Sequence, residues 1–145
     1  MPSFGYYLNA LGRCGGTFRS ARMADSGVGP HDQSYLFHVC RHPGLSQEAL
    51  GKALCVHKSH VTRHLAHLEK QGYITRTPDP DDRRVLLVHP TKKAEGILPV
   101  LREVNAEWRA ILSKGFEEAE IAMFEDLLSR ALANGRAFLE SEGME

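Results

Sequence analysis

The sequence lacks any long uninterrupted run of apolar residues. No apolar stretch approaches the roughly 20 residues that a membrane-spanning helix needs. The first residues also lack the apolar core and the small-residue cleavage site of a secretory leader. We therefore expect a protein that resides in the cytoplasm and has no membrane partner.

Cysteine is scarce, with three residues in a chain of 145: Cys14, Cys40 and Cys55. Their odd number and irregular spacing fit neither a disulfide framework nor a structural zinc site, and they indicate a reduced compartment. Sequence patterns typical of catalysis are missing as well, since the chain has no His-Glu-X-X-His motif, no phosphate-binding glycine loop and no evident Ser-His-Asp arrangement. The sequence therefore predicts a protein that is not an enzyme and that uses no cofactor and no metal.

A net charge is also absent, because 18 Lys and Arg balance 18 Asp and Glu. The charges are unevenly distributed, however. Residues 57–93 hold eight basic and four acidic side chains, whereas residues 94–145 hold five basic and eleven acidic ones. A basic middle and an acidic end are typical of a protein with one surface for phosphates and another that is kept away from them. Charge alone does not distinguish this arrangement from a chance fluctuation.

Apolar residues recur first at helical and then at strand spacing, with turn residues between the segments. We expect helices over 4–23, 32–41, 46–54 and 58–71, strands over 73–77 and 85–89, and two long helices that begin near 91 and 118. The first helix should be short or broken, because Gly12, Gly15 and Gly16 each cost up to about 1 kcal/mol relative to alanine. The predicted fold class is all-α with a small two-stranded β-wing.

Several helix ends carry capping residues. Asp32, Ser46 and Thr91 are of the types that accept hydrogen bonds from the first backbone amides of a helix. Gly72 follows the helix over 58–71 and can adopt the left-handed conformation that ends many helices. These positions set the expected boundaries of the elements.

The helix over 58–71 has two different sides. With roughly 100° of rotation per residue, Val61, Leu65 and Leu68 fall on one side, which we expect to be buried. The opposite half carries small, hydroxyl and basic side chains. These are Ser59, Thr62, Arg63, Ala66 and Lys70. They suit the major groove of DNA, where bulk would block approach and hydrogen-bond donors are needed, although an ordinary solvated helix face carries the same residue types.

The stretch from Leu45 to Ala94 closely resembles the MarR family of winged helix-turn-helix regulators. The family's recognition-helix pattern is a basic residue, Ser, a variable residue, Val-Thr-Arg, Leu and Leu-Glu. It is matched by Lys58, Ser59, His60, Val61, Thr62, Arg63, Leu65, Leu68 and Glu69. The family's wing signature, an acidic residue and proline followed by Asp-X-Arg, is matched by Asp79-Pro80 and Asp82-Arg83-Arg84.

The resemblance implies a single domain over residues 1–145. Its winged helix-turn-helix lobe covers about 31–90, and its dimerisation helices cover about 4–23 and 91–142. It also implies a homodimer that binds double-stranded DNA at a pseudo-palindromic operator and regulates transcription, most often as a repressor released by a small aromatic or phenolic effector. The sequence does not identify the effector site; the candidates for lining it are Tyr7, His38, Arg41 and Trp108.

The resemblance also assigns the residues that meet DNA. The expected contacts are Lys58, Ser59, His60, Thr62, Arg63, Lys70, Arg83 and Arg84. Arg84 would be presented by the wing to the minor groove, which attracts arginine where it is narrow. Asp82 lies two residues earlier and is expected to orient the Arg84 guanidinium.

Histidine is frequent in the recognition helix, where His57, His60, His64 and His67 occupy one arc beside the DNA side. Pairs of histidines three or four residues apart can chelate metal, but a structural zinc site needs four ligands and the arc holds no cysteine or carboxylate. We interpret the arc as a solvated flank that also contacts phosphates. The alternative function is a metal- or pH-responsive DNA-binding sensor that uses this arc.

Overall fold

The computed structural model describes residues 1–144. Its elements are α1 (Phe4–Arg22), α2 (Asp32–Arg41), β1 (Leu45–Ser46), α3 (Gln47–Leu54), α4 (Lys58–Lys70), β2 (Ile74–Pro78), β3 (Leu86–Pro90), α5 (Lys92–Leu112) and α6 (Glu118–Ser141). The predicted fold class, helical with a small β-wing, is confirmed. Among these helices, none is long and apolar enough to cross a membrane.

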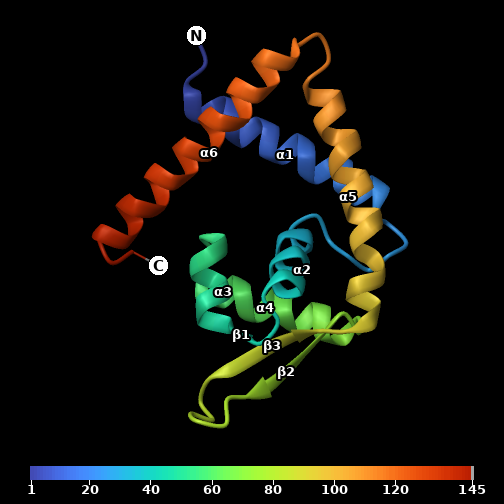
Figure 1. Cartoon of the computed structure of the whole chain (residues 1–145), viewed down its shortest axis with the longest axis vertical. Coiled ribbons are helices and arrows are strands. Elements are labelled where there is room, and N and C mark those ends of the chain that lie inside the picture. The colour runs from blue at the N-terminus through green and yellow to red at the C-terminus, as the bar shows by residue number, and fades with distance from the viewer. Residues whose placement is uncertain (145) are drawn as a thin grey trace.

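The elements form two parts (Figure 1). α2, α3 and α4 gather above the sheet, whereas α1, α5 and α6 build an open frame around and beyond them. α5 leads from the sheet to the far end of the molecule, and α6 returns toward α3. There the Arg136 guanidinium donates a hydrogen bond of 2.7 Å to the Ala53 carbonyl. The frame is therefore tied to the helix-turn-helix part at both ends.

The sheet has the order β1-β3-β2, and both pairings are antiparallel. β2 and β3 are the two predicted strands, shifted toward the C-terminus by a residue, with Ile74 opposite Pro90 and Pro78 opposite Leu86. β1 is an additional strand of two residues, in which Leu45 lies opposite Val88. Two residues are too few to show an alternating pattern, so the sequence does not predict this strand.

The core lies where α2, α3 and α4 meet the sheet and the start of α5. Its fully buried side chains include Tyr35, Leu36, Val39, Leu50, Val61, Leu65, Leu68, Tyr73, Ile74, Val88 and Leu101. Val61, Leu65 and Leu68 are at most 1% exposed, so the predicted inner side of the recognition helix is confirmed. The hydroxyls of Ser46 and Thr91 cap α3 and α5 as expected.

The prediction of a short or broken first helix was wrong, because α1 is continuous over 19 residues. Ser3 caps it by accepting a hydrogen bond from the Tyr6 amide. Gly15 is the only buried residue of α1, and a Cβ built there would lie 3.2 Å from Nε1 of Trp108. The Trp108 indole also stacks on Phe18, with ring centroids 5.0 Å apart. At Gly15, close packing against α5 therefore offsets the helical cost of the glycine.

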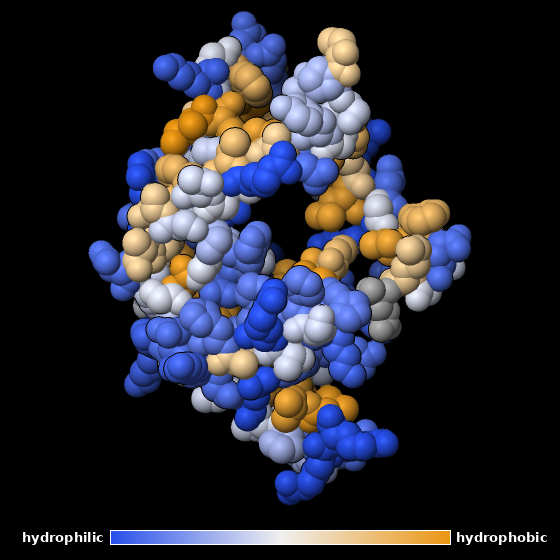
Figure 2. Space-filling model, turned by 180° about the vertical axis from the view of Figure 1, so that it is seen from behind, coloured by the Kyte–Doolittle hydropathy of each residue, from blue (hydrophilic) through white to orange (hydrophobic). Residues whose placement is uncertain are grey.

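α6 buries none of its residues within the chain. Large apolar side chains exposed on α1 and α6 include Phe4, Tyr7, Leu8, Leu11, Met123, Phe124, Leu127, Leu128, Leu132 and Phe138. Figure 2 shows apolar groups at the surface of the frame, in contrast to the largely hydrophilic part below it. Uncovered apolar surface of this extent is typical of an interface.

Candidate nucleic-acid interface

The outer side of α4 is held in place by a close approach to α3. A Cβ built on Gly51 would lie 3.1 Å from a methyl group of Val61, so the absence of a side chain lets the two helices pack tightly. Cys55 ends α3 with a left-handed φ of 54°, and His57 begins α4 by accepting a hydrogen bond from the Ser59 amide. Short helix, tight turn and recognition helix thus form one rigid unit.

All six expected DNA contacts on α4 lie on its exposed side: Lys58, Ser59, His60, Thr62, Arg63 and Lys70. The Thr62 hydroxyl donates to the Lys58 carbonyl, and the Arg63 guanidinium lies 3.2 Å from Nδ1 of His60. Within residues 1–144, no carboxylate forms an ion pair with Lys58, Arg63 or Lys70. Their positive charge is therefore available to an external anion.

Other basic residues of the same segment are used inside the protein. Arg76 of β2 forms an ion pair of 3.1 Å with Glu69 and donates to Gln47, which joins the wing to α4 and to the start of α3. The hydrogen bond from Arg76 lowers the pKa of Glu69. Lys93 donates to the Gln71 carbonyl and lies over the Tyr73 ring. The excess of basic residues in the sequence therefore overstates the charge that faces outward.

The wing presents Arg83 and Arg84 in the loop between β2 and β3, and both are exposed. The two oxygens of Asp82 accept hydrogen bonds of 3.0 and 3.1 Å from the Arg84 guanidinium, and Oδ1 also accepts one from the Arg84 amide. These bonds lower the pKa of Asp82 and raise that of Arg84. The structure thus places Asp82 where it orients an arginine side chain that is 91% exposed.

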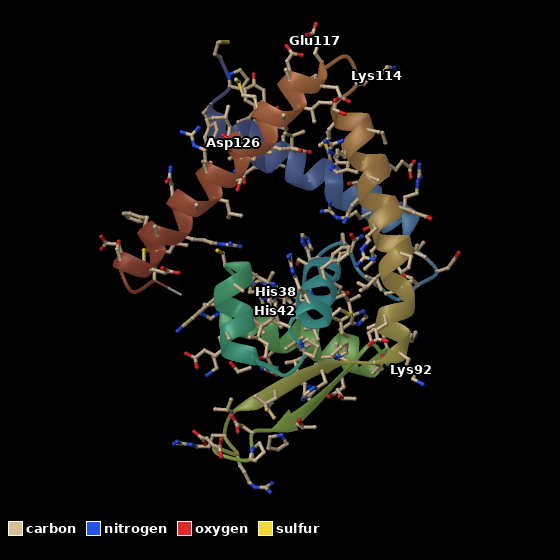
Figure 3. All side chains as sticks on the ribbon, in the orientation of Figure 1. His38, His42, Lys92, Lys114, Glu117 and Asp126 are labelled. Carbon is tan, nitrogen blue, oxygen red and sulfur yellow. The ribbon has the colours of Figure 1, made fainter. Side chains whose placement is uncertain are left out.

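The charges are separated along the molecule. The basic segment forms α4 and the wing, at the end of the molecule opposite the turn between α5 and α6. Figure 3 shows Glu117 and Asp126 of α6 in the distant part of the frame, while Lys92 starts α5 beside the sheet. The acidic side chains of α6 are thereby kept away from the candidate interface.

Three of the four histidines of the arc, His57, His60 and His67, are exposed, and His64 is partly buried. His57 caps α4 and His60 contacts Arg63, but His64 and His67 face the loop before α2 and the start of α2. His67 donates to the Gly27 carbonyl, at 2.9 Å. His64 is therefore turned partly inward, whereas the His67 side chain is 44% exposed and belongs to the solvated flank that the sequence predicts. The phosphate contacts expected of the arc remain a prediction.

Asp32 is the partner that the histidines meet. It is 2% exposed, and it is not the predicted N-cap, because His31 occupies that position without a capping side chain. Oδ1 of Asp32 accepts a hydrogen bond of 2.7 Å from Nδ1 of His64, and Oδ2 accepts one of 2.7 Å from the Gly29 amide. The His64 ring also stacks on Tyr35. One buried carboxylate therefore joins the recognition helix to α2 and its preceding loop.

The histidine arc can be compared with the ligand arrangement of a metal site. Within the described residues 1–144, no three His, Cys, Asp or Glu side chains are grouped as metal ligands would be. His64 and His67 approach Asp32 one on each oxygen, at 2.7 and 3.6 Å. His64 is hydrogen-bonded to this carboxylate, whereas the hydrogen bond of His67 goes to the Gly27 carbonyl.

The residues suggested for an effector site are distributed over three helices, with Tyr7 on α1, His38 and Arg41 on α2 and Trp108 on α5. Trp108 packs against Phe18, while Tyr7 is exposed on α1. His38 of α2 lies beside His42, the residue that follows this helix (Figure 3), with ring centroids 4.9 Å apart. Burial, followed by the positive charges of His42, Arg136 and Arg41, lowers the pKa of His38.

Comparison with known proteins places these features in a family. The sequence model of the MarR family matches residues 32–86. The chain is 29% identical over 100 residues to the HTH-type transcriptional regulator YybA of Bacillus subtilis (strain 168), which covers 69% of this chain and 67% of that protein. The matches to three curated relatives cover 58 to 67% of the relatives' own lengths.

Solved structures agree over almost the whole chain. The crystal structure of MarR superposes with a TM-score of 0.88 at 26% identity, covering 97% of this chain and 95% of that one. A protein from Listeria monocytogenes, crystallised in complex with 26mer DNA, has a TM-score of 0.86 at 24% identity and covers 100% of this chain and 98% of that one. At 24% identity, this second match shows similarity of fold alone.

The bonds of Asp32 predict a measurable contribution to stability. We expect Asp32→Ala to lower the free energy of unfolding by about 1–3 kcal/mol, because the Gly29 amide and His64 Nδ1 lose a buried acceptor. The matched control is Asp82→Ala, whose carboxylate lies on the exposed wing and whose loss should leave the unfolding midpoint unchanged. Urea unfolding of both variants at one protein concentration checks this. An unchanged midpoint for Asp32→Ala would show that these bonds do not hold the helix.

Proposed function

The chain belongs to the MarR family of transcriptional regulators, and from this premise we propose that it binds double-stranded DNA sequence-specifically and regulates transcription in the cytoplasm, without catalysing a reaction. The observation that carries the proposal is the outer side of α4, where Lys58, Arg63 and Lys70 are exposed and unpaired with any described carboxylate. The Listeria relative in complex with 26mer DNA supports the same partner.

The two basic elements suit different grooves. The major groove admits a helix, and an arginine can meet the O6 and N7 acceptors of guanine with two hydrogen bonds. We assign this role to Arg63. The minor groove is narrower and distinguishes mainly A·T from G·C pairs, and we assign it to Arg84, which Asp82 holds at the exposed tip of the wing. α4 would therefore provide specificity, and the wing would chiefly add affinity.

The frame helices provide the surface for dimerisation. We propose that α1, α5 and α6 of two chains pack around a two-fold axis, because α6 buries nothing within one chain and its apolar side chains are uncovered. A two-fold dimer presents two recognition helices about one turn of DNA apart, which matches a pseudo-palindromic operator. We further propose that the protein is a repressor and that a small-molecule effector releases it from DNA.

The division of roles between α4 and the wing predicts two different mutant phenotypes. Arg63→Ala should reduce the ratio of operator to scrambled-duplex affinity by about 10- to 100-fold, because a bidentate base contact contributes about 1–3 kcal/mol of discrimination. Arg84→Ala should weaken binding to both duplexes by similar factors, and Asp82→Ala should do the same more mildly. Fluorescence anisotropy on an operator selected from random duplexes, at two salt concentrations, gives these ratios.

The roles of Arg63 and Arg84 would be reversed if Arg84→Ala abolished the preference for the operator while Arg63→Ala preserved it. Ser20→Ala is a suitable reference variant, since Ser20 is an exposed residue of α1 in the frame. Its duplex affinities should equal those of the unmodified protein.

The exposed apolar side of α6 predicts that one charged substitution there separates the dimer into monomers. Leu132 is 50% exposed in the chain alone, so Leu132→Asp should leave the protomer folded but place an unpaired carboxylate in the apolar interface, which is strongly unfavourable. Sedimentation velocity should show monomers at micromolar concentration, and operator binding should be lost together with the dimer. The matched control is Asn134→Asp, which adds the same charge roughly 200° around the helix and should remain dimeric. A Leu132→Asp dimer with unchanged affinity would contradict the assigned interface.

A further inference from the structure

A cavity of about 650 Å³ lies between the C-terminal part of α6 and the helix-turn-helix part. Its lining includes Arg136 and Leu139 of α6, Gly51 of α3 and Val61 of α4. Because α6 buries none of its residues within the chain, close packing does not fix the angle between these two parts. A directional contact across the cavity would fix it.

Arg136 makes such a contact. Its guanidinium donates a hydrogen bond of 2.7 Å to the Ala53 carbonyl. Ala53 lies in the last turn of α3, where backbone carbonyls have no partner within the helix and form the negative end of the helix dipole. A guanidinium suits such a carbonyl, because hydrogen bonds from a charged donor are stronger than those between neutral groups. The bond joins two residues that are 83 positions apart in the sequence.

This bond acts next to the recognition helix. Ala53 lies shortly before His57, which caps α4. The two helices form one rigid unit, since a Cβ built on Gly51 of α3 would lie only 3.1 Å from Val61 of α4. A displacement of the end of α3 therefore moves α4 with it. Arg136 thereby fixes where the recognition helix lies relative to α6.

The helix-turn-helix part is also joined to the frame on its other side. Ala94, Leu101 and Val104 of α5 are buried against it, and Arg19 of α1 donates a hydrogen bond to the Pro30 carbonyl. Figure 1 shows α5 and α3 at opposite edges of the helix-turn-helix part. Contacts along the α5 edge alone would leave rotation about that edge open. The bond from Arg136 lies at the α3 edge and opposes this rotation.

We propose that Arg136 is a positioning residue that determines which half-site spacing the dimer accepts. The proposal rests on the proposed function, in which two recognition helices of a dimer read two half-sites. A change of one base pair in their spacing moves a half-site by about 3.4 Å and turns it by about 35° around the DNA axis. A dimer whose helix-turn-helix parts are held at both edges fits one spacing. Without the bond from Arg136, each part rotates to meet a displaced half-site.

Three duplexes test this role by fluorescence anisotropy: the operator selected from random duplexes, and the same half-sites with one base pair added or removed between them. The unmodified protein should bind the altered duplexes at least tenfold more weakly than the operator. Arg136→Met should reduce this difference to less than threefold. It should also weaken binding to the operator itself, because the recognition helices are less preorganised. An unmodified protein without a spacing preference, or an Arg136→Met variant that keeps the tenfold preference, would overturn the proposal.

Two further variants separate the hydrogen bond from the charge. Arg130→Met removes the same charge from α6, but the Arg130 guanidinium pairs with Asp126 of its own helix, so the spacing preference should stay at tenfold or more. Arg136→Lys keeps a charged donor and should restore part of the preference. Arg136→Met should remain dimeric in sedimentation velocity and keep its discrimination between operator and scrambled half-sites, which we assign to Arg63. Loss of the dimer would show that Arg136 belongs to the dimer interface and would overturn the assigned role.

A measurement without DNA distinguishes the failure of this proposal from the failure of the proposed function. Spin labels on Ala66→Cys, at the exposed side of α4, report the distance between the two recognition helices of a dimer in which the exposed Cys14 and Cys55 are replaced by serine. Electron-electron resonance should give a narrow distance distribution that Arg136→Met broadens and Arg130→Met does not.

The two results together decide both hypotheses. If the protein binds its operator but Arg136→Met changes neither the width of the distance distribution nor the spacing preference, the role of Arg136 is refuted and the proposed function stands. If Arg136→Met broadens the distribution but the unmodified protein binds no duplex, Arg136 fixes the orientation of the recognition helix and the proposed function fails.

Discussion

The burial of one side of α4 determines which of its side chains can face a partner. Val61, Leu65 and Leu68 are buried against α2, α3 and the sheet. With these side chains in the core, only one rotation of α4 about its axis is available. Arg63 and Lys70 must then face outward. A core substitution that rotated this helix would therefore alter recognition without touching any residue that meets DNA.

Asp32 adds a second constraint, which acts on the flank of the same helix. Hydrophobic contacts fix the depth of α4 in the core, but they are not directional. The hydrogen bonds that the Asp32 carboxylate accepts from His64 and Gly29 are directional. The His64 ring also stacks on Tyr35 of α2, which adds a second contact between the two helices. The recognition helix and the buried carboxylate are thus parts of one contact region.

Local signals in the sequence were sufficient for much of the fold. The inner side of α4, the caps at Ser46 and Thr91, and the left-handed Gly72 all follow from spacing and residue type, and the structure has them. Contacts between distant segments were not predictable in this way. The continuity of α1 depends on Trp108, more than 90 residues from Gly15, and the inward turn of His64 depends on Asp32. The unpaired amide of Gln33 likewise becomes visible only when its surroundings are known.

In the proposed function, exposed basic side chains of α4 and the wing neutralise DNA phosphates. The direct measurement is duplex affinity as a function of salt concentration. Each phosphate contact contributes a slope of about −0.9 in a plot of log affinity against log salt. A dimer that presents Lys58, Arg63, Lys70, Arg83 and Arg84 on each protomer should give a slope between about −4 and −9. Duplex affinity that is independent of salt, or no duplex binding even at low salt, would contradict the role of these basic side chains.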